Sequence, residues 1–358
     1  MSDRVSYFYR CFFILIILMI PLLATGRAVN NEHTYSFPKD HYAHPECGKE
    51  WWYYTGHLTT EDNKKYGYEL TFFRVGVESQ RTRQSASAWA MRDIYFAHMA
   101  ISDEGEKKFH FWEKMNRKGP GIAGAEDDRL YVWNEGWLLE GDNETHHLTA
   151  HEDDYGIDLV LIPLKPPVIH DQTGPMGQSP GSTLASYYYS LTRIDTKGHI
   201  WIAGKKHKVR GITWMDHQFF THFFKQWDWF SIQLNNQIEI MFFHFRSENG
   251  RIDPASFGTI VDETGNSTDL SLSEFTITPM GTWTSKKSGA VYPSKWSIDI
   301  KGHYISLNIM PTFNEQELIT QQAIYWEGSC LISGTYKGKK VTGRGYAELT
   351  GYAGRTPQ

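Results

Sequence analysis

The sequence predicts an all-β protein built from two successive antiparallel barrels, and three observations support this fold class. After residue 28, short alternating segments rich in Tyr, Trp, Phe, Ile and Thr replace any sustained helical period. Turn clusters such as TEDNKK, DTKG, SENG, DETGNS and KGKK separate these segments. Finally, one β pattern occurs twice along the chain, which predicts two units of the same kind.

The repeat is clearest in the strands that open and close each half. EWWYYTGHL (50–58) is matched by QWDWFSIQL (226–234), and each precedes an apolar strand, YELTFFR or IEIMFFHFR. The closing hairpins, IAGKKHKVRGITWMDHQ and ISGTYKGKKVTGRGYAELTG, share one order of glycine, aromatic and acidic residues. Closing each sheet into a barrel removes its exposed edges. We therefore expect an N-terminal barrel over residues 29–218 and a C-terminal barrel over residues 219–358.

Composition and the first residues indicate an exported globular protein. The 358 residues are 40% hydrophobic and 22% charged, and the net charge of -5 gives no electrostatic footprint for nucleic acid. Arg4 and Arg10 precede the apolar run CFFILIILMI, and small residues follow it up to Ala28. This pattern predicts a signal peptide over residues 1–28 and no stable membrane span after its cleavage. We expect a periplasmic or secreted protein.

The cysteines leave two interpretations open. Of the three, Cys11 lies in the predicted leader, so Cys47 and Cys330 remain. In an oxidising compartment these two could form a disulfide that joins the start of the fold to its end. The alternative is a pair of buried free thiols.

Several segments together resemble the AttH-like proteins, from about residue 35 to about residue 355. The segments are EWWYYTGHL, YGYELTFFR, YFAHMAISD, ASYYYSLTR, GITWMDHQF, WDWFSIQL, YWEG and ELTGY. These tandem lipocalin-like proteins are related to carotenoid 1,2-hydratase (hydroxyneurosporene synthase) and kievitone hydratase. The resemblance implies an elongated hydrophobic ligand, isoprenoid or lipid, and a cofactor-free hydro-lyase that hydrates an alkene. The alternative is a non-catalytic carrier or chaperone linked to an export system.

The chemistry of alkene hydration indicates which residues could act. Protonation of an unactivated double bond needs a carboxylic acid kept neutral by apolar surroundings, aromatic faces for the cation, and a base that orients water. In GITWMDHQFF (211–220) an acid and an imidazole lie side by side among aromatic residues. The candidate acid/base residues are Asp216, His217, Glu50 and Asp228. The candidate ligand-binding residues are Trp51, Trp52, Trp214, Trp227, Trp229 and His244.

The repeat also supports a structural role for Asp216. Glu348 holds the corresponding position in the second half, and a catalytic acid is rarely needed twice. One structural form is an ion pair inside each barrel, Arg74 with Asp216 and Arg246 with Glu348, because a buried carboxylate needs a partner to stay ionised.

Side chains alternate along a strand, so Asp216 and His217 should face opposite sides of the sheet. If Asp216 points into its barrel, His217 points outward, where Glu50 and Asp228 could meet it. The alternative is that these three are ordinary surface or interface residues.

Residues that break the repeat are the stronger functional candidates. By sequence, Glu50 corresponds to Gln226, Asp228 to Trp52, His217 to Leu349 and His244 to Arg74. The resemblance also has a gap. It implies a proton-donating aspartate in the strand after the DHQF counterpart, but EIMFFHFR offers only Glu239, His244 and Arg246.

Other chemistries have little support in the sequence. The 16 histidines show no zinc signature, so we expect no metal site. The resemblance implies that no cofactor is used. A G-x-S-x-G nucleophile elbow is missing, which gives no support to a serine hydrolase of that type.

Overall fold

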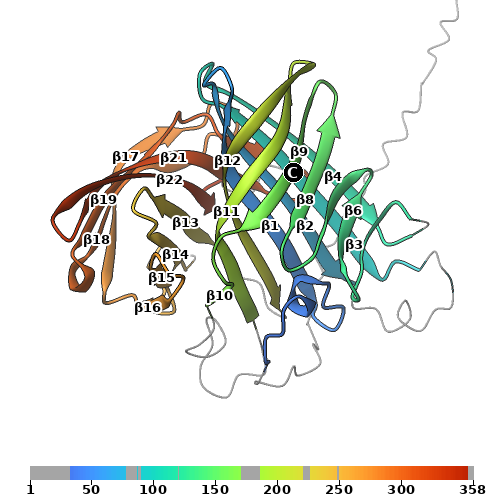
Figure 1. Ribbon diagram of the computed structural model, residues 1–358, viewed down its shortest axis with the longest axis horizontal. Helices are drawn as coiled ribbons and strands as arrows, with labels where there is room; N and C mark the ends of the chain where they lie inside the picture. Colours follow the sequence, from blue (N-terminus) through green and yellow to red (C-terminus); the bar gives the residue numbers. More distant parts are fainter. Residues whose placement is uncertain are drawn as a thin grey trace, which may run out of the picture.

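The computed structural model describes residues 33–77, 87, 90–119, 121–170, 186–220, 226–247 and 250–353. The described chain forms two antiparallel sheets (Figure 1), with short 3₁₀ turns at Lys39–His41 (η1) and Lys301–His303 (η2). The expected signal peptide lies outside these residues. Among the described residues, no helix has the length and apolarity to cross a membrane. The predicted all-β, lipocalin-like class is confirmed.

The first sheet takes its strands from the N-terminal part of the chain. They are Lys49–Thr60 (β1), Lys65–Gly76 (β2), Asp93–Asp103 (β3), Lys108–Arg117 (β4), Ala123–Ala125 (β5), Leu130–Asn134 (β6), Trp137–Gly141 (β7), His146–Glu152 (β8), Tyr155–Pro163 (β9), Val168–Ile169 (β10), Ser186–Ile202 (β11) and Lys205–Phe220 (β12). Their spatial order is β4-β3-β2-β1-β12-β11-β9-β8-β7-β6-β5, with β10 paired to β11.

The second sheet contains the strands that follow. They are Trp227–Leu234 (β13), Glu239–Phe245 (β14), Phe257–Val261 (β15), Ser267–Ser271 (β16), Phe275–Thr284 (β17), Val291–Ile300 (β18), Ile305–Pro311 (β19), Glu317–Ile319 (β20), Ile324–Tyr336 (β21) and Lys339–Thr350 (β22). Their order is β16-β15-β14-β13-β22-β21-β19-β18-β17, with β20 paired to β21. This order repeats that of the first sheet strand for strand from β4 to β7, so the sequence repeat is a repeat of topology.

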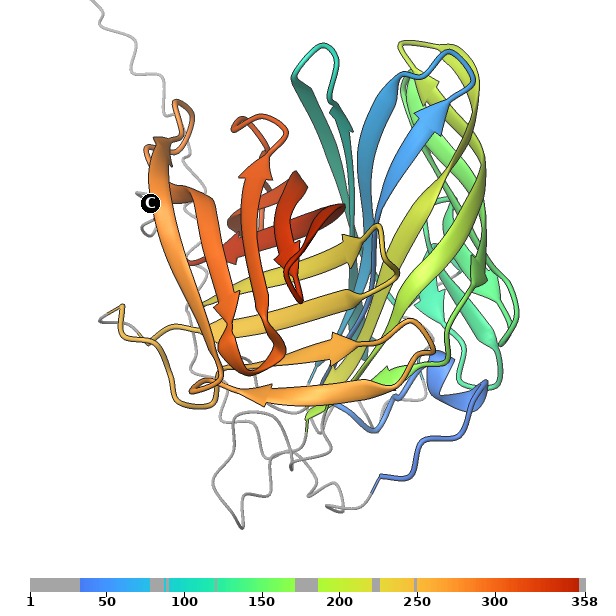
Figure 2. The same ribbon diagram turned by 60° about the vertical axis from the view of Figure 1, so that its left-hand side comes forward.

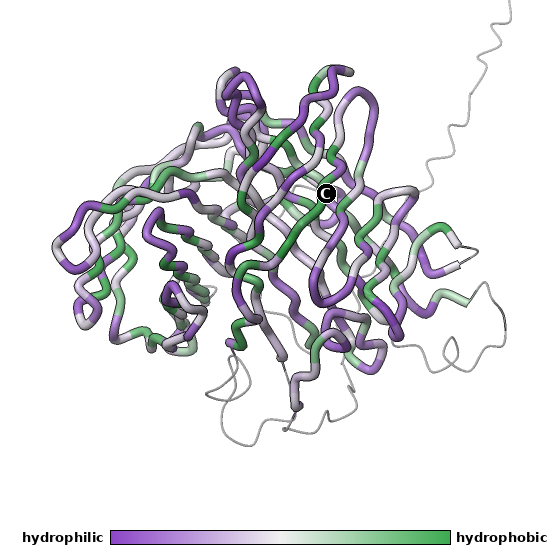
Figure 3. The backbone as a smooth tube through the Cα atoms, viewed as in Figure 1, coloured by the Kyte–Doolittle hydropathy of each residue, from purple (hydrophilic) through white to green (hydrophobic). Residues whose placement is uncertain are grey.

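Each sheet curls around its own apolar core, as Figure 2 shows from the side. Alternating apolar side chains on the concave faces fill the two interiors, including Tyr54, Leu70 and Leu159 in the first and Phe230, Ile298 and Leu307 in the second. Along the tube in Figure 3, apolar stretches follow the strands and hydrophilic stretches gather at the hairpin turns. This pattern is what two barrels with exposed turns require.

The two sheets pack through corresponding strands. The rings of Trp51 and Trp227, which hold the same repeat position in β1 and β13, lie 6.2 Å apart. The next corresponding pair, Tyr53 and Trp229, meets edge to face at 5.2 Å. An approximate twofold axis therefore runs between β1 and β13 and relates the two sheets. Next to these two strands, Gly67 of β2 makes room for Tyr346 of β22, because a Cβ there would lie 2.4 Å from the Tyr346 hydroxyl oxygen.

Ion pairs also connect the two sheets at this interface. Glu239 at the start of β14 accepts hydrogen bonds from Lys165 and Arg193 of the first unit, each at 2.5 Å. The side chain of Glu239 is fully buried, and burial raises its pKa against the effect of both cations. Glu239 therefore joins the sheets and does not line the cavity described below.

The two cysteines do not form a disulfide. Cys47 is buried beside Tyr187 and Phe219, whereas Cys330 lies in the core of the second barrel. Of the two interpretations open from the sequence, the structure has buried free thiols.

Candidate functional site

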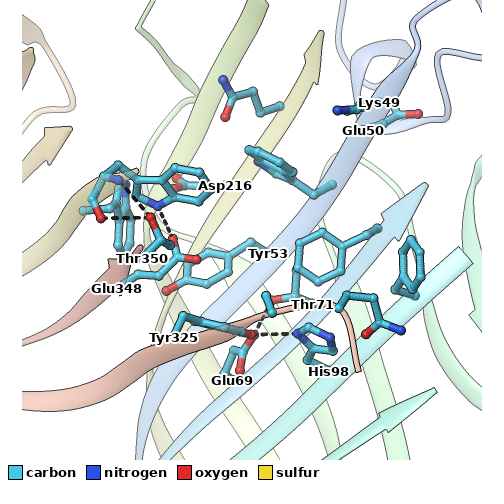
Figure 4. Close-up of a pocket in the computed structure, with 18 of the residues that line it drawn as sticks. Lys49, Glu50, Tyr53, Glu69, Thr71, His98, Asp216, Tyr325, Glu348 and Thr350 are labelled. Atoms are coloured by element: carbon cyan, nitrogen blue, oxygen red, sulfur yellow. Dashed lines mark hydrogen bonds between the residues drawn. The ribbon is translucent and has the colours of Figure 1, made fainter. Parts of the chain in front are cut away.

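A cavity of about 370 Å³ lies between the two sheets, against the outer faces of β1, β2, β12 and β13. Its walls are mostly aromatic, and Figure 4 shows the polar groups gathered among the rings. The aromatic lining is Trp51, Tyr53, Phe73, Phe96, Tyr188, Trp227, Trp229, Phe243 and Tyr325. The acidic lining is Glu50, Glu69, Asp216 and Glu348. A volume at the lower end of the range of small-molecule sites suits a ligand of modest size.

Strand alternation decides which predicted residues reach this cavity. On β1, Trp51 and Tyr53 line the cavity, whereas Trp52 is packed in the first barrel. On β12, Asp216 lines the cavity, whereas His217 stacks on Trp52 at 4.9 Å inside the barrel. Asp216 and His217 therefore face opposite sides, as expected. The arrangement considered from the sequence, with Asp216 inside its barrel and His217 outside, is reversed in the structure, where Asp216 faces the second sheet.

Asp216 has no cationic partner among the described residues. Its carboxylate accepts hydrogen bonds from the Tyr188 hydroxyl at 2.7 Å, from Trp214 Nε1 at 2.7 Å and from the Ser190 hydroxyl. Burial raises the pKa of Asp216 to about 7, although the three hydrogen bonds act to lower it. The expected ion pair with Arg74 is absent from the described chain, so that hypothesis is wrong.

Glu348 reaches the same cavity from the second sheet. Pairing registers place it opposite Trp229 on β13, just as Asp216 lies opposite Tyr53 on β1. Trp227 Nε1 donates to Glu348 Oε2 at 2.8 Å, the one hydrogen bond of this carboxyl among the described residues. Burial raises the pKa of Glu348 to about 7. Its expected partner Arg246 instead binds Asp228, with Nε and Oδ1 3.1 Å apart, so the second ion-pair hypothesis is also wrong.

Two further buried acids, Glu69 and Glu327, complete an acidic cluster. Glu69 of β2 accepts a hydrogen bond from the Thr71 hydroxyl at 2.7 Å. Glu327 of β21 does not line the cavity but lies next to its lining residue Tyr53. It accepts a hydrogen bond from the Tyr53 hydroxyl at 2.8 Å, which links the two sheets. Burial raises the pKa of both carboxyls; Glu348 raises both further, and Glu69 also raises the pKa of Glu327. Burial therefore favours the protonated form of Glu69 and Glu327 near neutral pH.

Glu50 lies at the other end of the cavity and has the opposite character. Arg74 Nε donates to Glu50 Oε2 at 3.0 Å, and His217 Nε2 and His44 Nδ1 lie 3.0 and 2.8 Å from Oε1. Burial alone would raise the pKa of Glu50, but Arg74 and the two imidazoles hold it well below its usual value. Glu50 and His217 do meet, as proposed from the sequence, but as part of a buried ion network.

This network contains donor types that metal ions use. His33, Asp40 and His44 form one group and His44, Glu50 and His217 another, with the ligand atoms of each within 4.8 Å of one another. A metal would first have to displace the proton of His44, whose pKa is raised to about 9 by Asp40 and Glu50 despite burial. The hydrogen bonds between these side chains and the Arg74 guanidinium account for the cluster as a charge network.

The remaining candidates lie away from the cavity. Asp228 faces the other side of β13, where it binds Arg246 and accepts from the Tyr352 hydroxyl at 3.0 Å. His244 is opposite Asp228 on β14, and Phe72 is opposite Trp52 on β2. His244 therefore corresponds to Phe72 and not to Arg74, which corrects the sequence alignment. Trp214 does not line the cavity but supports it, through its bond to Asp216 and an edge-to-face contact with Trp229 at 6.1 Å.

Sequence reasoning missed Glu69, His98, Glu327 and Tyr325. A signal was present for the acids, because Glu69 and Glu327 are single acidic residues within otherwise apolar or aromatic strands. Their meeting could not be read from the chain, because it depends on how one sheet packs on the other.

Comparison with known proteins shows which family has this sequence pattern and fold. The sequence pattern that describes AttH-like proteins matches residues 28–352. The chain belongs to the AttH-like family. Among curated proteins, no sequence gives a significant match.

Solved structures share the fold over nearly their whole length. The structure of an AttH protein from Nitrosomonas europaea is 27% identical to this AttH-like chain, with a TM-score of 0.79, covering 91% of this chain and 99% of that one. Kievitone hydratase from Nectria haematococca is 16% identical with a TM-score of 0.68, covering 88% and 92%. CghA is 11% identical with a TM-score of 0.50, covering 92% and 96%. The last two likenesses concern the fold alone.

Proposed function

We propose that this AttH-like protein binds an unsaturated isoprenoid or lipid between its two sheets and hydrates a carbon–carbon double bond there without a cofactor. The observation that carries the proposal is the pair Asp216 and Glu348. Both carboxyls are buried in an aromatic cavity, and neither has a cationic partner among the described residues. A carboxylic acid that stays neutral near pH 7 is the group that protonation of an alkene requires.

The hydrogen bonds suggest different roles for the two acids. Three donors stabilise the carboxylate form of Asp216, whereas Glu348 accepts one hydrogen bond from the described residues, that of Trp227. When the pair holds one proton, Glu348 is therefore the neutral acid and Asp216 the carboxylate. The Glu348 proton passes to an alkene carbon and leaves a tertiary cation. Water adds to the cation and gives up a proton to Asp216, after which exchange between the pair resets the site.

The aromatic wall supports the cationic intermediate. Trp227, Trp229 and Tyr53 surround the two acids, and their ring faces attract positive charge. The kievitone hydratase fold neighbour is named for a hydration reaction, which agrees in reaction type. Glu50, His217 and Asp228, also considered as acid or base residues, are each held in an ion pair or a hydrogen-bonded network. We assign them a structural role in this reaction.

A non-catalytic carrier is the second candidate, and the apolar walls favour it equally. In that role the protein binds the same ligand without changing it. The leader-like first 28 residues favour an exported protein under either proposal, in the periplasm or secreted, and a transport system is then a natural partner of the carrier.

Native mass spectrometry of the protein from its own host, followed by lipid extraction, tests binding. Incubation of the extracted ligand with the protein in D₂O tests chemistry, since hydration places deuterium on carbon. Hydration predicts deuterated, water-added product with wild type and at least about a hundredfold less with Glu348→Gln. Asp228→Asn, outside the cavity, is the matched control. Ligand recovered unchanged after incubation with wild type would reject hydration and support the carrier.

A further inference from the structure

Two polar atoms in the cavity wall have no hydrogen-bond partner in the part of the chain that the structure describes. Among the described residues, Glu69 Oε2 and His98 Nε2 are buried without a hydrogen bond. Both residues line the cavity. They project from the neighbouring strands β2 and β3, where His98 is paired with Thr71, two residues from Glu69. Figure 4 shows Glu69 and His98 side by side at one end of the site. Buried polar groups are nearly always paired, so these two atoms point to a ligand.

The other polar atoms of these side chains are held in place. Glu69 Oε1 accepts from the Thr71 hydroxyl at 2.7 Å, and His98 Nδ1 lies 2.7 Å from the Tyr325 hydroxyl. Tyr325 also lies 3.5 Å from Glu69 Oε1, which links the two residues. Each side chain is therefore oriented by one of its atoms. Glu69 Oε2 is left open to the cavity, and His98 Nε2 has only the nearby Gln322 side chain, which also lines the cavity, as a neighbour that could share its ligand. That is the arrangement of a preorganised binding site.

Burial favours the uncharged form of both groups near neutral pH. It raises the pKa of Glu69 to about 8, and it lowers the pKa of His98 to about 4 although the nearby Gln322 side chain acts to raise it. A neutral carboxyl offers an O–H donor, and a neutral imidazole nitrogen offers one donor or one acceptor. No lysine or arginine bonds to Glu69 or His98 among the described residues. This environment suits a neutral oxygen and opposes a carboxylate or phosphate.

We propose that Glu69 and His98 form a subsite for a neutral hydroxyl or carbonyl oxygen at one end of the ligand. The ligand of this protein is thus an oxygenated isoprenoid or lipid, not a pure hydrocarbon. This inference rests on the proposed function only in that the ligand occupies the cavity, and it holds for an enzyme and for a carrier. A hydrocarbon would leave both polar groups buried and unpaired, which lowers its affinity.

Three probes with the same carbon skeleton test the subsite: farnesol, farnesene and farnesoic acid. Trp51, Trp227 and Trp229 line the cavity, so quenching of tryptophan fluorescence in the full chain reports binding. At pH 7 we expect farnesol to bind at least about tenfold more tightly than farnesene, and the anionic acid to bind more weakly than farnesol.

Variants assign the preference to the subsite. Glu69→Leu and His98→Phe should each bring the farnesol affinity close to that of farnesene. Glu69→Gln keeps a neutral donor and acceptor of the same shape and should keep the preference. Gln218→Leu is the matched control, because Gln218 lines the same cavity opposite Trp51, four residues along β1 from the partner of Glu69. It should retain the preference for farnesol. Circular dichroism verifies the fold of each variant.

Equal affinity of the wild type for farnesol and farnesene would overturn the subsite and leave cavity binding intact. A farnesol preference that survives both Glu69→Leu and His98→Phe would also overturn it. Failure of all three probes to bind would instead reject a cavity for ligands of this class, and with it the proposed function.

Discussion

Asp216 and Glu348 hold the same position in the two sheets and line one cavity from opposite sides. Asp216 lies opposite Tyr53, and Glu348 lies opposite Trp229. Burial raises the pKa of both carboxyls to about 7. An acid repeated because each barrel needs it structurally would point into the barrel interior. The residues that point there are the next ones along each strand, His217 and Leu349. The duplication of the fold has thus brought two acids together at its twofold junction.

The rate of alkene protonation should depend on pH through this pair. The reaction needs Glu348 protonated and Asp216 ionised, so the pH–rate profile should be bell-shaped with its maximum near pH 7. Above the maximum the rate should fall about tenfold per pH unit, because the neutral acid is lost. Deuterium incorporation measured from pH 5 to pH 9 tests this, and a flat profile would contradict the assignment.

The stability of the fold should also depend on pH through Glu348. The folded-state pKa of about 7 lies above the unfolded value, so the folded state binds more protons between them. The contribution of Glu348 to the free energy of unfolding is therefore fully present below about pH 4 and is lost as the pH rises through 7.

Glu348→Gln removes this loss. Relative to wild type, its free energy of unfolding should rise by about 2–3 kcal/mol between pH 5 and pH 8.5, at about 1.4 kcal/mol per pKa unit. Urea denaturation at both pH values measures this change. Glu106→Gln, at an exposed position, is the control and should show no such gain.

Arg74 should be coupled energetically to Glu50 and not to Asp216. Arg74→Met removes the guanidinium from the buried Glu50 carboxylate and leaves only the imidazolium of His44 beside it, which should cost about 3 kcal/mol. In a double-mutant cycle, Glu50→Gln should recover part of that cost, because the unpaired charge is gone. The cycle of Arg74→Met with Asp216→Asn should be additive. Strong coupling in this second cycle would contradict the observed pairing.

Both cysteines should resist modification in the folded protein. Burial raises the pKa of Cys47 to about 12 and that of Cys330 still further, so little thiolate forms. Peptide mapping after iodoacetamide treatment should find both residues unmodified in the native protein and alkylated after unfolding. A peptide that joins Cys47 to Cys330 through a disulfide would refute this prediction.

Much of the architecture could be predicted because it depends on local patterns. Alternation of apolar residues predicted strands, and the matched segments around Trp51 and Trp227 predicted two barrels of one kind. The same matches aligned Asp216 with Glu348, as the pairing registers do. One local error was the partner of His244, because a short apolar strand offers several alignments that differ by two residues.

The sequence by itself determined the β class, the repeat, the AttH-like resemblance and the fact that Asp216 and His217 face opposite ways. Tertiary structure alone decided which of the two faces the cavity, because both sides of β12 are buried, one by the barrel and one by the neighbouring sheet. It also decided that Arg74 pairs with Glu50, so that Asp216, Glu348 and Glu69 have no cationic partner within the described part of the chain. The packing of one sheet on the other depends on many residues far apart in the chain. This packing sets the pKa of the buried acids and therefore the reactions that the site can support.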